Sequence, residues 1–300
     1  MIIKGLDVGY SHTKDNNGRI FRSAYSTNDT SVVGSKKLTI DGKNYYIGSG
    51  KMTSEVDKTN TELNKVCTIY NIVMSDAKDL CVVAGLPIGQ YEEQKVRLKE
   101  SILGYNKCVV SYDNRPCSFK IHDVIVSPQG VSSLYTLKEL LGEYIVIDIG
   151  GLTVDPCLVE FTATSSQILK SDTWYKGMRT LYSSIIEIVN NRYGLKLDNS
   201  YAEKILLMGL KFRGVQQDLS FLKPLLQDYI DILVEEIKLK YPTETTPMYL
   251  VGGGTDLLYN AFRKRFQDVN KIVNPQFANA IGYYNIGYFK FAERSVACGR

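Results

Sequence analysis

Two aspartates, Asp7 and Asp148, each stand at the end of an apolar stretch and two residues before a glycine. Such apolar stretches predict buried strands. Two carboxylates at strand ends, followed by glycines that let backbone N–H groups approach an anion, predict a clamp for a magnesium-bound polyphosphate. Either aspartate alone is equally well explained as the cap of a turn, but the pair favours the clamp.

The first loop follows Asp7 in the run DVGYSHTK. We expect its backbone N–H groups and hydroxyls to contact the β and γ phosphates, and its lysine to neutralise phosphate charge. For His12, a local hydrogen-bonded turn role is favoured over phosphate contact. The expected phosphate-contacting residues of this loop are Gly9, Tyr10, Ser11, His12, Thr13 and Lys14.

Two further glycine-rich segments follow apolar stretches. The first is predicted to form the opposing phosphate loop, and the second to let backbone pack against a ribose or the α-phosphate. A plain strand-to-helix turn is the alternative for the second. The pattern fits neither a P-loop nor a dinucleotide-binding fingerprint. The residues are Gly150, Gly151, Leu152 and Thr153 in one segment, and Gly252, Gly253, Gly254 and Thr255 in the other.

Hydrolysis of a polyphosphate requires a metal ion and an oriented water. Asp7 and Asp148 are predicted to hold Mg²⁺ through water, because magnesium keeps much of its hydration and uses few carboxylates. Gln129, between Pro128 and Gly130 at the start of a predicted helix, is the candidate for orienting the water. Its alternative role is to cap that helix. The predicted catalytic set is therefore Gln129, Asp148 and Asp7.

The first half of the chain must position these residues with alternating strands and helices. Strands are predicted at 2–8 and around 19–25, with a hairpin whose turn is Asp41-Gly42, a strong hairpin signal. Helices are predicted over about 60–73 and 90–103, separated by a strand over 80–87. Strand-like runs over 107–111 and 118–126 lead to a helix over about 131–141.

The second half restarts the same order, with strands over 144–148, 154–161 and 167–173, which suggests two similarly built halves. Helices are predicted over 177–193, 200–209 and 219–241. Apolar residues recur at helical spacing in the last of these and predict core packing. A short strand over 248–251, a helix over 255–266 and a final helix opened near Pro275 complete the chain.

Composition narrows the class of protein. A chain of 300 residues is long enough for two cores, and 44% hydrophobic with 23% charged residues argues against wholesale disorder. The net charge of +4 gives no argument for direct nucleic-acid or membrane contact. The six cysteines lack metal spacing and predict reduced thiols in a cytoplasmic protein. No stretch approaches the roughly 20 apolar residues that span a bilayer.

The three loops, in this order, resemble the phosphate 1, phosphate 2 and adenosine motifs of the actin, sugar-kinase and heat-shock-chaperone superfamily. Within it, the chain is similar to bacterial actin-like proteins of the ParM and Alp type. The resemblance is carried by DVGYS with Lys14, SPQG (127–130), DIGGLTVD (148–155), VGGG (251–254), and NPQFANA (274–280) with Gly282. Tyr10 departs from the pattern, since many relatives carry Ser or Thr there.

The resemblance implies an α/β, actin-like fold with two similar domains around a nucleotide cleft. Domain I would comprise 1–143 plus 275–300, with a small outer subdomain at about 29–76, and domain II would comprise 144–274. By match, Asp7 and Asp148 lie on the metal side and Gln129 positions water. Glu203 and Lys204 match a base-contacting helix more loosely, and Gly177 is placed near the sugar.

The implied activity is hydrolysis of ATP to ADP, with GTP as a possible substrate and Mg²⁺ as cofactor. The resemblance further implies self-association into dynamic filaments that segregate plasmid or phage DNA through a DNA-binding adaptor of the ParR type. The alternatives are a non-polymerising actin-fold ATPase and a small-molecule kinase. A kinase normally places a catalytic aspartate near its substrate as general base, and no such constellation is evident.

Overall fold

The computed structural model describes residues 1–28, 36–52, 57, 59 and 61–297. Its strands are β1 (Ile2–Val8), β2 (His12–Asp15), β3 (Ile20–Arg22), β4 (Tyr25–Ser26), β5 (Lys37–Ile40), β6 (Lys43–Ile47), β7 (Asp79–Leu86), β8 (Val110–Tyr112), β9 (Arg115–Cys117), β10 (Lys120–Pro128), β11 (Gly142–Ile149), β12 (Val154–Phe161), β13 (Ser166–Ser171), β14 (Lys211–Phe212), β15 (Val215–Gln216), β16 (Met248–Val251) and β17 (Val269–Lys271). Its α-helices are α1 (Glu62–Val73), α2 (Ile88–Gly104), α3 (Val131–Leu134), α4 (Met178–Tyr193), α5 (Ser200–Met208), α6 (Lys223–Lys240), α7 (Thr255–Arg263) and α8 (Ala278–Ala297).

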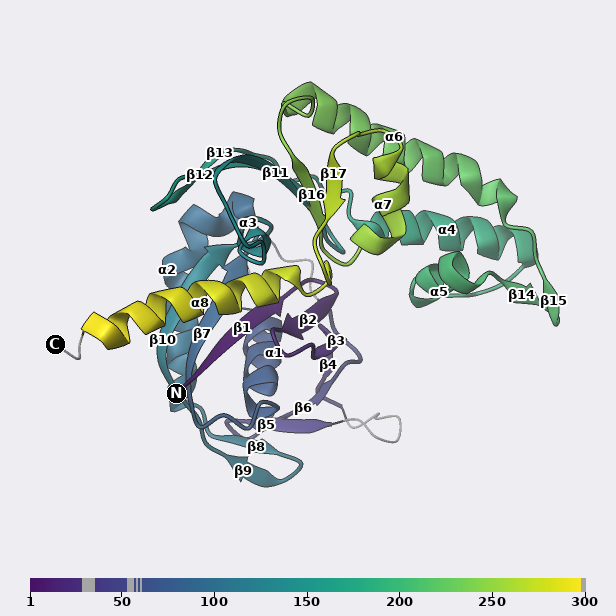
Figure 1. Cartoon of the computed structure of the whole chain (residues 1–300). Helices are drawn as coiled ribbons and strands as arrows, with labels where there is room; N and C mark the ends of the chain where they lie inside the picture. Colours follow the sequence, from purple (N-terminus) through teal and green to yellow (C-terminus); the bar gives the residue numbers. More distant parts are fainter. Residues whose placement is uncertain (29–35, 53–56, 58, 60, 298–300) are drawn as a thin grey trace.

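The first lobe is built on a sheet of order β10-β7-β1-β2-β3, in which β10, β7 and β1 run parallel. Helix α8 lies across one face, and α1 and α2 cover the other (Figure 1). Strand β7 is apolar along nearly its whole length, as a strand covered on both faces must be. Leu80 and Val82 join the core on the α1 side, whereas Cys81 and Val83 pack with Tyr283 of α8.

The second lobe is built on a sheet of order β13-β12-β11-β16-β17, with α4 to α7 on one face. Side chains alternate along β11, as the two-residue period of a strand requires. Ile145 and Ile147 point into the core under the helices, whereas Val146 joins a cluster with Val131 and Leu134 of the first lobe. This shared cluster joins the two lobes behind the pocket described below.

The final helix returns to the first lobe and packs closely on β1. A side chain at Gly5 would overlap the carbonyl of Ala280, so the approach requires glycine. This packing supports the proposal that residues 275–300 belong with domain I; the exact boundaries stay a prediction.

A small sheet of order β4-β6-β5-β8-β9 lies at the outer end of the first lobe. The predicted hairpin is confirmed: β5 and β6 pair antiparallel, and Asp41 and Gly42 both have positive φ, 50° and 81°. Parts of the predicted outer subdomain, residues 29–35, 53–56, 58 and 60, lie outside the described residues, as does Cys298. The other five cysteines form no disulfide. None of the described helices has both the length and the apolarity needed to cross a membrane.

Glu62, the first residue of α1, ties this outer sheet to the helix. Its carboxylate accepts hydrogen bonds from the hydroxyls of Tyr25 (2.5 Å) and Tyr45 (2.8 Å). It also forms an ion pair with the ammonium group of Lys43. These contacts, the lysine first, lower the pKa of Glu62 to about 2.

We expect Glu62→Gln to lower the free energy of unfolding by an amount that depends on pH. Because the pKa is depressed in the fold, the stabilisation is present above the ordinary value of 4.5 and is lost as the pH falls through about 2. Denaturant unfolding of both proteins between pH 3 and pH 7 measures this difference, with the exposed Glu100→Gln as control. A difference that stays constant over that range would contradict the assignment.

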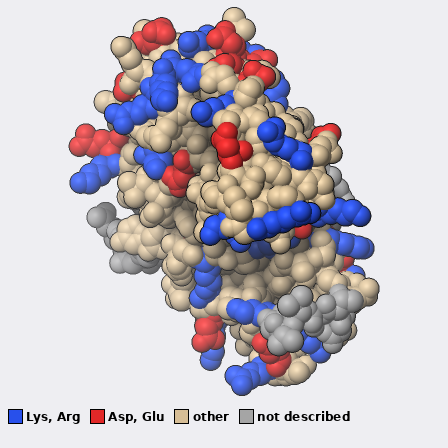
Figure 2. All heavy atoms as spheres, turned by 90° about the vertical axis from the view of Figure 1, so that its right-hand side faces the viewer, with Lys and Arg blue, Asp and Glu red and all other residues tan. Residues whose placement is uncertain are grey.

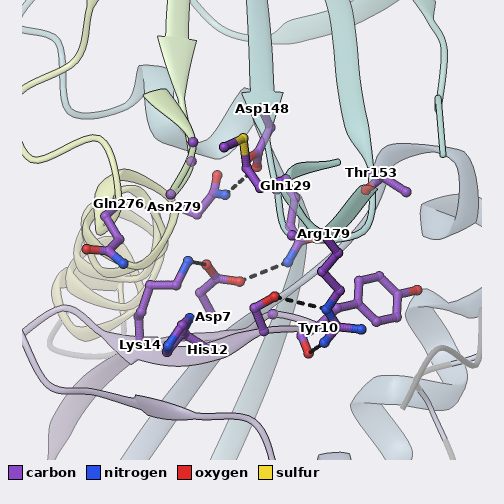
Figure 3. Close-up of a pocket in the computed structure, with 18 of the residues that line it drawn as sticks. Asp7, Tyr10, His12, Lys14, Gln129, Asp148, Thr153, Arg179, Gln276 and Asn279 are labelled. Atoms are coloured by element: carbon purple, nitrogen blue, oxygen red, sulfur yellow. Dashed lines mark hydrogen bonds and ion pairs between the residues drawn. The ribbon is translucent and has the colours of Figure 1, made fainter. Parts of the chain in front are cut away.

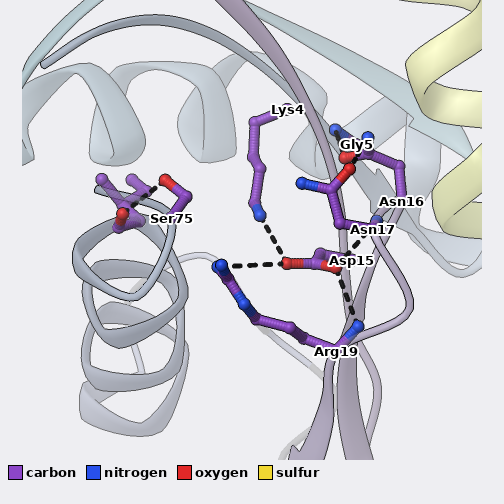
Figure 4. A network of polar contacts seen from close by, with 8 residues as sticks. Lys4, Gly5, Asp15, Asn16, Asn17, Arg19 and Ser75 are labelled. Atoms are coloured by element: carbon purple, nitrogen blue, oxygen red, sulfur yellow. Dashed lines mark hydrogen bonds and ion pairs between the residues drawn. The ribbon is translucent and has the colours of Figure 1, made fainter. Parts of the chain in front are cut away.

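A buried ion pair fixes the first hairpin from the face opposite the pocket (Figure 4). Lys4 of β1 and Asp15 of β2 are almost completely buried and contact each other, and Arg19 lies 3.7 Å from the same carboxylate oxygen. Burial lowers the pKa of Lys4, which the Asp15 carboxylate opposes. Because residues alternate along a strand, this contact holds the backbone that carries Asp7 and Lys14 on the other face.

Two predictions of local structure were wrong. The helix expected over 131–141 is only α3, four residues long. The hydroxyls of Ser133 and Thr136 donate to the carbonyls of Gly130 and Ser133, and such bonds compete with continued helix. The strand expected around 19–25 is divided between two sheets, as β3 and β4, and the preceding strand β2 was not predicted. The short strands β14, β15 and β17 were also missed.

Candidate functional site

A pocket opens between the two lobes where β1, β10, β11 and β16 end (Figure 3). Each of these strands delivers a loop or side chain to it, two from each lobe. Ligand sites of α/β folds commonly form at strand ends of this kind. The lining consists of Asp7, Gly9, Tyr10, Ser11, His12, Lys14, Gln129, Asp148, Gly150, Gly151, Thr153, Asp155, Met178, Arg179, Tyr182, Glu203, Gly252, Gly253, Gly254, Gln276 and Asn279.

The first loop is the tight turn between β1 and β2. The N–H of Gly9 donates to the carbonyl of His12 (3.1 Å), and the strand pairing places Asp7 opposite Lys14. The Lys14 ammonium lies 3.0 Å from Asp7 Oδ2. The cation therefore stands at the inner end of the pocket, held by the carboxylate beside it.

Gln129 reaches the same carboxylate from β10. Its Nε2 donates to Asp7 Oδ1 (2.9 Å), and its backbone N–H donates to the carbonyl of Leu86 (2.8 Å). The next residue, Gly130, has φ 76°, a conformation that favours glycine. The turn thus directs the Gln129 amide into the pocket rather than along a helix.

Asp148 enters from the second lobe at the end of β11. Asn279 donates from Nδ2 to Asp148 Oδ2 (2.7 Å), and its Oδ1 accepts from the N–H of Gly130 (2.9 Å). One amide at the start of α8 therefore connects the two lobes. Burial, together with the nearby Asp7 and Asp155, raises the pKa of Asp148 to about 6, against the effect of the Asn279 hydrogen bond. The pocket interior disfavours this negative charge.

The inner end of the pocket carries an excess of carboxylates. Asp7, Asp148 and Asp155 all line the pocket, with Lys14 as the nearby cation, and Asp155 accepts hydrogen bonds from the hydroxyls of Thr153 and Thr173. Hard oxygen ligands of this kind suit Mg²⁺, and the repulsion on Asp148 is what a divalent cation would relieve. Among the residues that the structure describes, no group of three or more His, Cys, Asp or Glu could hold a metal by itself. Two carboxylates fit an ion that keeps its water and phosphate ligands.

The second loop is fastened to the start of α4. The N–H groups of Met178 and Arg179 donate to the carbonyls of Gly150 (3.0 Å) and Gly151 (2.8 Å). A side chain at Gly177 would overlap the backbone of this loop. Gly177 therefore allows the loop to pack on the helix.

The structure brings most of the residues predicted from the sequence to one pocket. Five lie outside the lining. Thr13 points away from it because its neighbours in β2 face the pocket, and its hydroxyl bonds Ser23 (2.9 Å). The others are Leu152, Gly177, the exposed Lys204 and the buried Thr255, of which Gly177 and Thr255 flank the ends of loops.

Sequence reasoning missed six lining residues. Asp155, Gln276 and Asn279 stand inside motifs that were recognised, but no role was given to them. Met178 and Arg179 stand four and three residues before Tyr182 at the start of α4, a spacing that could have shown them once Gly177 was placed at the cleft. Asn279 lies 131 residues from Asp148, so no local pattern shows their contact.

Two α/β lobes with related sheets, joined behind a pocket of strand-end loops, define an actin-like fold. Residues 5–131 match the family described as the N-terminal domain of actin-like proteins, and residues 146–264 match the C-terminal family of archaeal MreB-like actin homologues. The chain has an actin-like fold, and each of its halves is similar to a family of actin homologues.

Whole-length relatives agree with this. Curated archaeal actin homologs from Thermoplasma acidophilum and Thermoplasma volcanium are 26% and 25% identical, over 99% of this chain and 100% of each relative. A crystal structure of an archaeal actin homolog in complex with ADP is similar with a TM-score of 0.81, at 23% identity, covering 96% of this chain and 100% of that one. A 15-stranded ParM filament from Clostridium botulinum is similar with a TM-score of 0.76, at 21% identity, covering 96% and 99%.

Proposed function

We propose that this protein binds ATP in the pocket between its lobes and hydrolyses it to ADP and phosphate. The observation that carries the proposal is the opposition of Asp7 and Asp148 at the ends of β1 and β11, each with a glycine loop beside it. ATP is proposed rather than GTP because a similar archaeal actin homolog was solved with ADP.

The roles of individual residues follow from their positions. Lys14 would pair with phosphate oxygens, and the N–H groups of the two loops would donate to them. Gln129 would orient the water whose oxygen bonds to the γ-phosphorus as the bond to the β-phosphate oxygen breaks, leaving ADP, phosphate and a proton. Asp7 and Asp148 would hold Mg²⁺ through its waters. The ion would supply charge stabilisation at the transferring phosphoryl group.

The nucleoside would lie toward the second lobe. Gly252 has φ 89°, and a side chain there would overlap Asp148, so this loop presents bare backbone to the pocket. Glu203 of α5 lines the same side and Lys204 does not, so Glu203 is the better candidate of the two for contact with the base.

Self-association into filaments is the second part of the proposal. It is supported by the similarity to a ParM filament and to an Alp12 filament structure. Segregation of plasmid or phage DNA through a ParR-type adaptor would be one use of such filaments. Because the archaeal actin homologs match over their whole length, another cytoskeletal use is the alternative. A cytoplasmic location belongs to the same proposal and rests on the sequence alone.

Direct nucleic-acid binding is not part of the proposal. On the face that Figure 2 shows, a row of Lys and Arg side chains crosses the middle, and Asp and Glu side chains lie above and below it. The modest net charge of +4 agrees with this distribution.

Adding Mg-ATP to the purified protein tests both parts. We expect light scattering to rise and then to decay as phosphate is released, with filaments visible by negative-stain imaging at the plateau. Phosphate release without scattering at any concentration would leave a non-polymerising ATPase or a kinase without its substrate. The absence of both signals, with no ADP binding by calorimetry, would refute the proposal.

A further inference from the structure

Arg179 crosses the pocket from the second lobe to the first loop (Figure 3). It stands in the first turn of α4, where its own N–H is tied to the carbonyl of Gly151. Its guanidinium donates to the carbonyl of Tyr10 and, through Nε, to the hydroxyl of Ser11 (3.3 Å). The Arg179 guanidinium of the second lobe thus contacts the tip of the first loop, which was predicted to bind the β and γ phosphates.

The partners of this guanidinium are neutral. They are a carbonyl, a hydroxyl and the sulfur of Met52, which lies 4.0 Å from Nη2. Within the described residues, no carboxylate lies within ion-pair distance of Arg179. Burial is the first cause of a lowered pKa at Arg179, and the nearby Arg22 is the second. A partly buried cation normally has an anionic partner. The neutral surroundings of the Arg179 guanidinium therefore indicate a place for an anionic ligand.

Other basic groups converge on the same loop tip. Arg22 of β3 lies 3.4 Å from the same Met52 sulfur, so cations from opposite lobes approach one neutral atom. The pKa of His12 is lowered by burial and then by Lys14, Arg22 and Arg179, which places all three cations near that ring. Lys14 is paired with Asp7, which leaves the two guanidinium groups as the excess positive charge.

The second phosphate loop meets the first at this point. A side chain at Gly151 would overlap the hydroxyl of Ser11, so the two loops nearly touch beside Arg179. We propose that Arg179 is a phosphate-binding residue supplied by the second lobe, which exchanges its bonds to the first loop for the β and γ phosphates of the nucleotide. A guanidinium fork suits phosphate oxygens better than the carbonyl and hydroxyl that it now contacts. This inference rests on the nucleotide pocket of the proposed function.

The test compares binding of ADP, AMP and inorganic tripolyphosphate by calorimetry. Arg179→Gln is expected to weaken ADP and tripolyphosphate by about 10- to 100-fold, the range for losing a charge-assisted hydrogen bond, and AMP by less than about threefold. Arg179→Lys keeps the charge but loses the fork, so its loss lies between. Arg192→Gln, in the last turn of the same helix, should bind all three as the unaltered protein does.

Two outcomes would overturn the inference. Equal weakening of AMP and ADP would show that Arg179 shapes the cleft instead of binding phosphate. Unchanged affinity for ADP and tripolyphosphate in Arg179→Gln would show that the guanidinium only ties the first loop. If the unaltered protein bound tripolyphosphate through Arg179 but no nucleotide, the proposed function would fail while this inference stood. The melting temperature of each unliganded variant establishes that it is folded.

Discussion

Asp148→Asn is expected to reduce phosphate release from Mg-ATP by about 100-fold or more, the cost of removing one preorganised charged group at a reacting centre. The side chain keeps its shape and can still accept the hydrogen bond from Asn279. What it loses is the negative charge that would hold Mg²⁺ opposite Asp7. The variant therefore tests charge at this position rather than packing.

The same substitution should stabilise the unliganded protein. The fold raises the pKa of Asp148 from 3.8 to about 6. Its stabilising contribution is present below the lower value and is lost as the pH rises through the higher one. At neutral pH the buried carboxylate thus costs on the order of 2 to 3 kcal/mol, which the neutral amide avoids in part. We expect the melting temperature to rise by about 3 °C at pH 7.

Calorimetry at pH 7 and pH 5 with a parallel phosphate-release assay measures both effects. The gain in melting temperature should shrink at pH 5, because the native Asp148 is then largely protonated. Asp228→Asn, at an exposed position of α6, is the matched control and should change neither quantity. Normal ATP hydrolysis by Asp148→Asn would show that Asp148 has no role in hydrolysis. One that is less stable at pH 7 would show that its charge is compensated in the fold.

Most of the residues that the sequence predicted from local patterns are ones that the structure brings to one pocket. Asp7 and its loop, Asp148 and its loop, and the Gly252 segment each combine a buried strand with a glycine turn, and both signals lie within a few residues. The actin-like fold followed from the order of these segments and was confirmed by the family matches and similar structures. The glycines and carboxylates, whose constraints are steric and electrostatic, were the residues easiest to find.

What the sequence could not show depends on contacts between the lobes. Asn279 joins Asp148 to Gly130, and Arg179 joins α4 to the first loop, across separations of 131 to 169 residues. Strand β2 was missed because a four-residue strand after a turn carries little apolar signal, with only Thr13 as a partly apolar buried side chain. Lys204 was predicted to line the pocket beside Glu203. Neighbouring residues on a helix face different directions, and only Glu203 reaches it.

The motifs also could not show to which group of actin-like proteins the chain is most similar. The ParM and Alp resemblance rests on loops that bind nucleotide, and filament and adaptor contacts come from other surfaces. The N-terminal match is to actin-like proteins in general, whereas the C-terminal match and the curated relatives are archaeal. Plasmid segregation therefore stays a proposal.

Gln129→Ala is expected to slow hydrolysis by about 100-fold while changing ATP affinity less than about threefold, because positioning the water contributes to the transition state more than to binding. In the structure the Gln129 amide is held at the inner end of the pocket by its bond to Asp7 Oδ1. Asp7 keeps its ion pair with Lys14 in the variant, so the phosphate-binding groups stay in place.

The consequence for assembly separates Gln129 from a residue that only binds. If filaments form with ATP and disassemble after hydrolysis, the variant should assemble normally and its light-scattering plateau should persist many times longer. Gln227→Ala, on the exposed face of α6, is the matched control and should decay as the unaltered protein does. Normal turnover in Gln129→Ala would show that Gln129 does not orient the water and serves only in the turn before α3. Slow turnover with an unchanged decay of scattering would show that disassembly does not wait for hydrolysis.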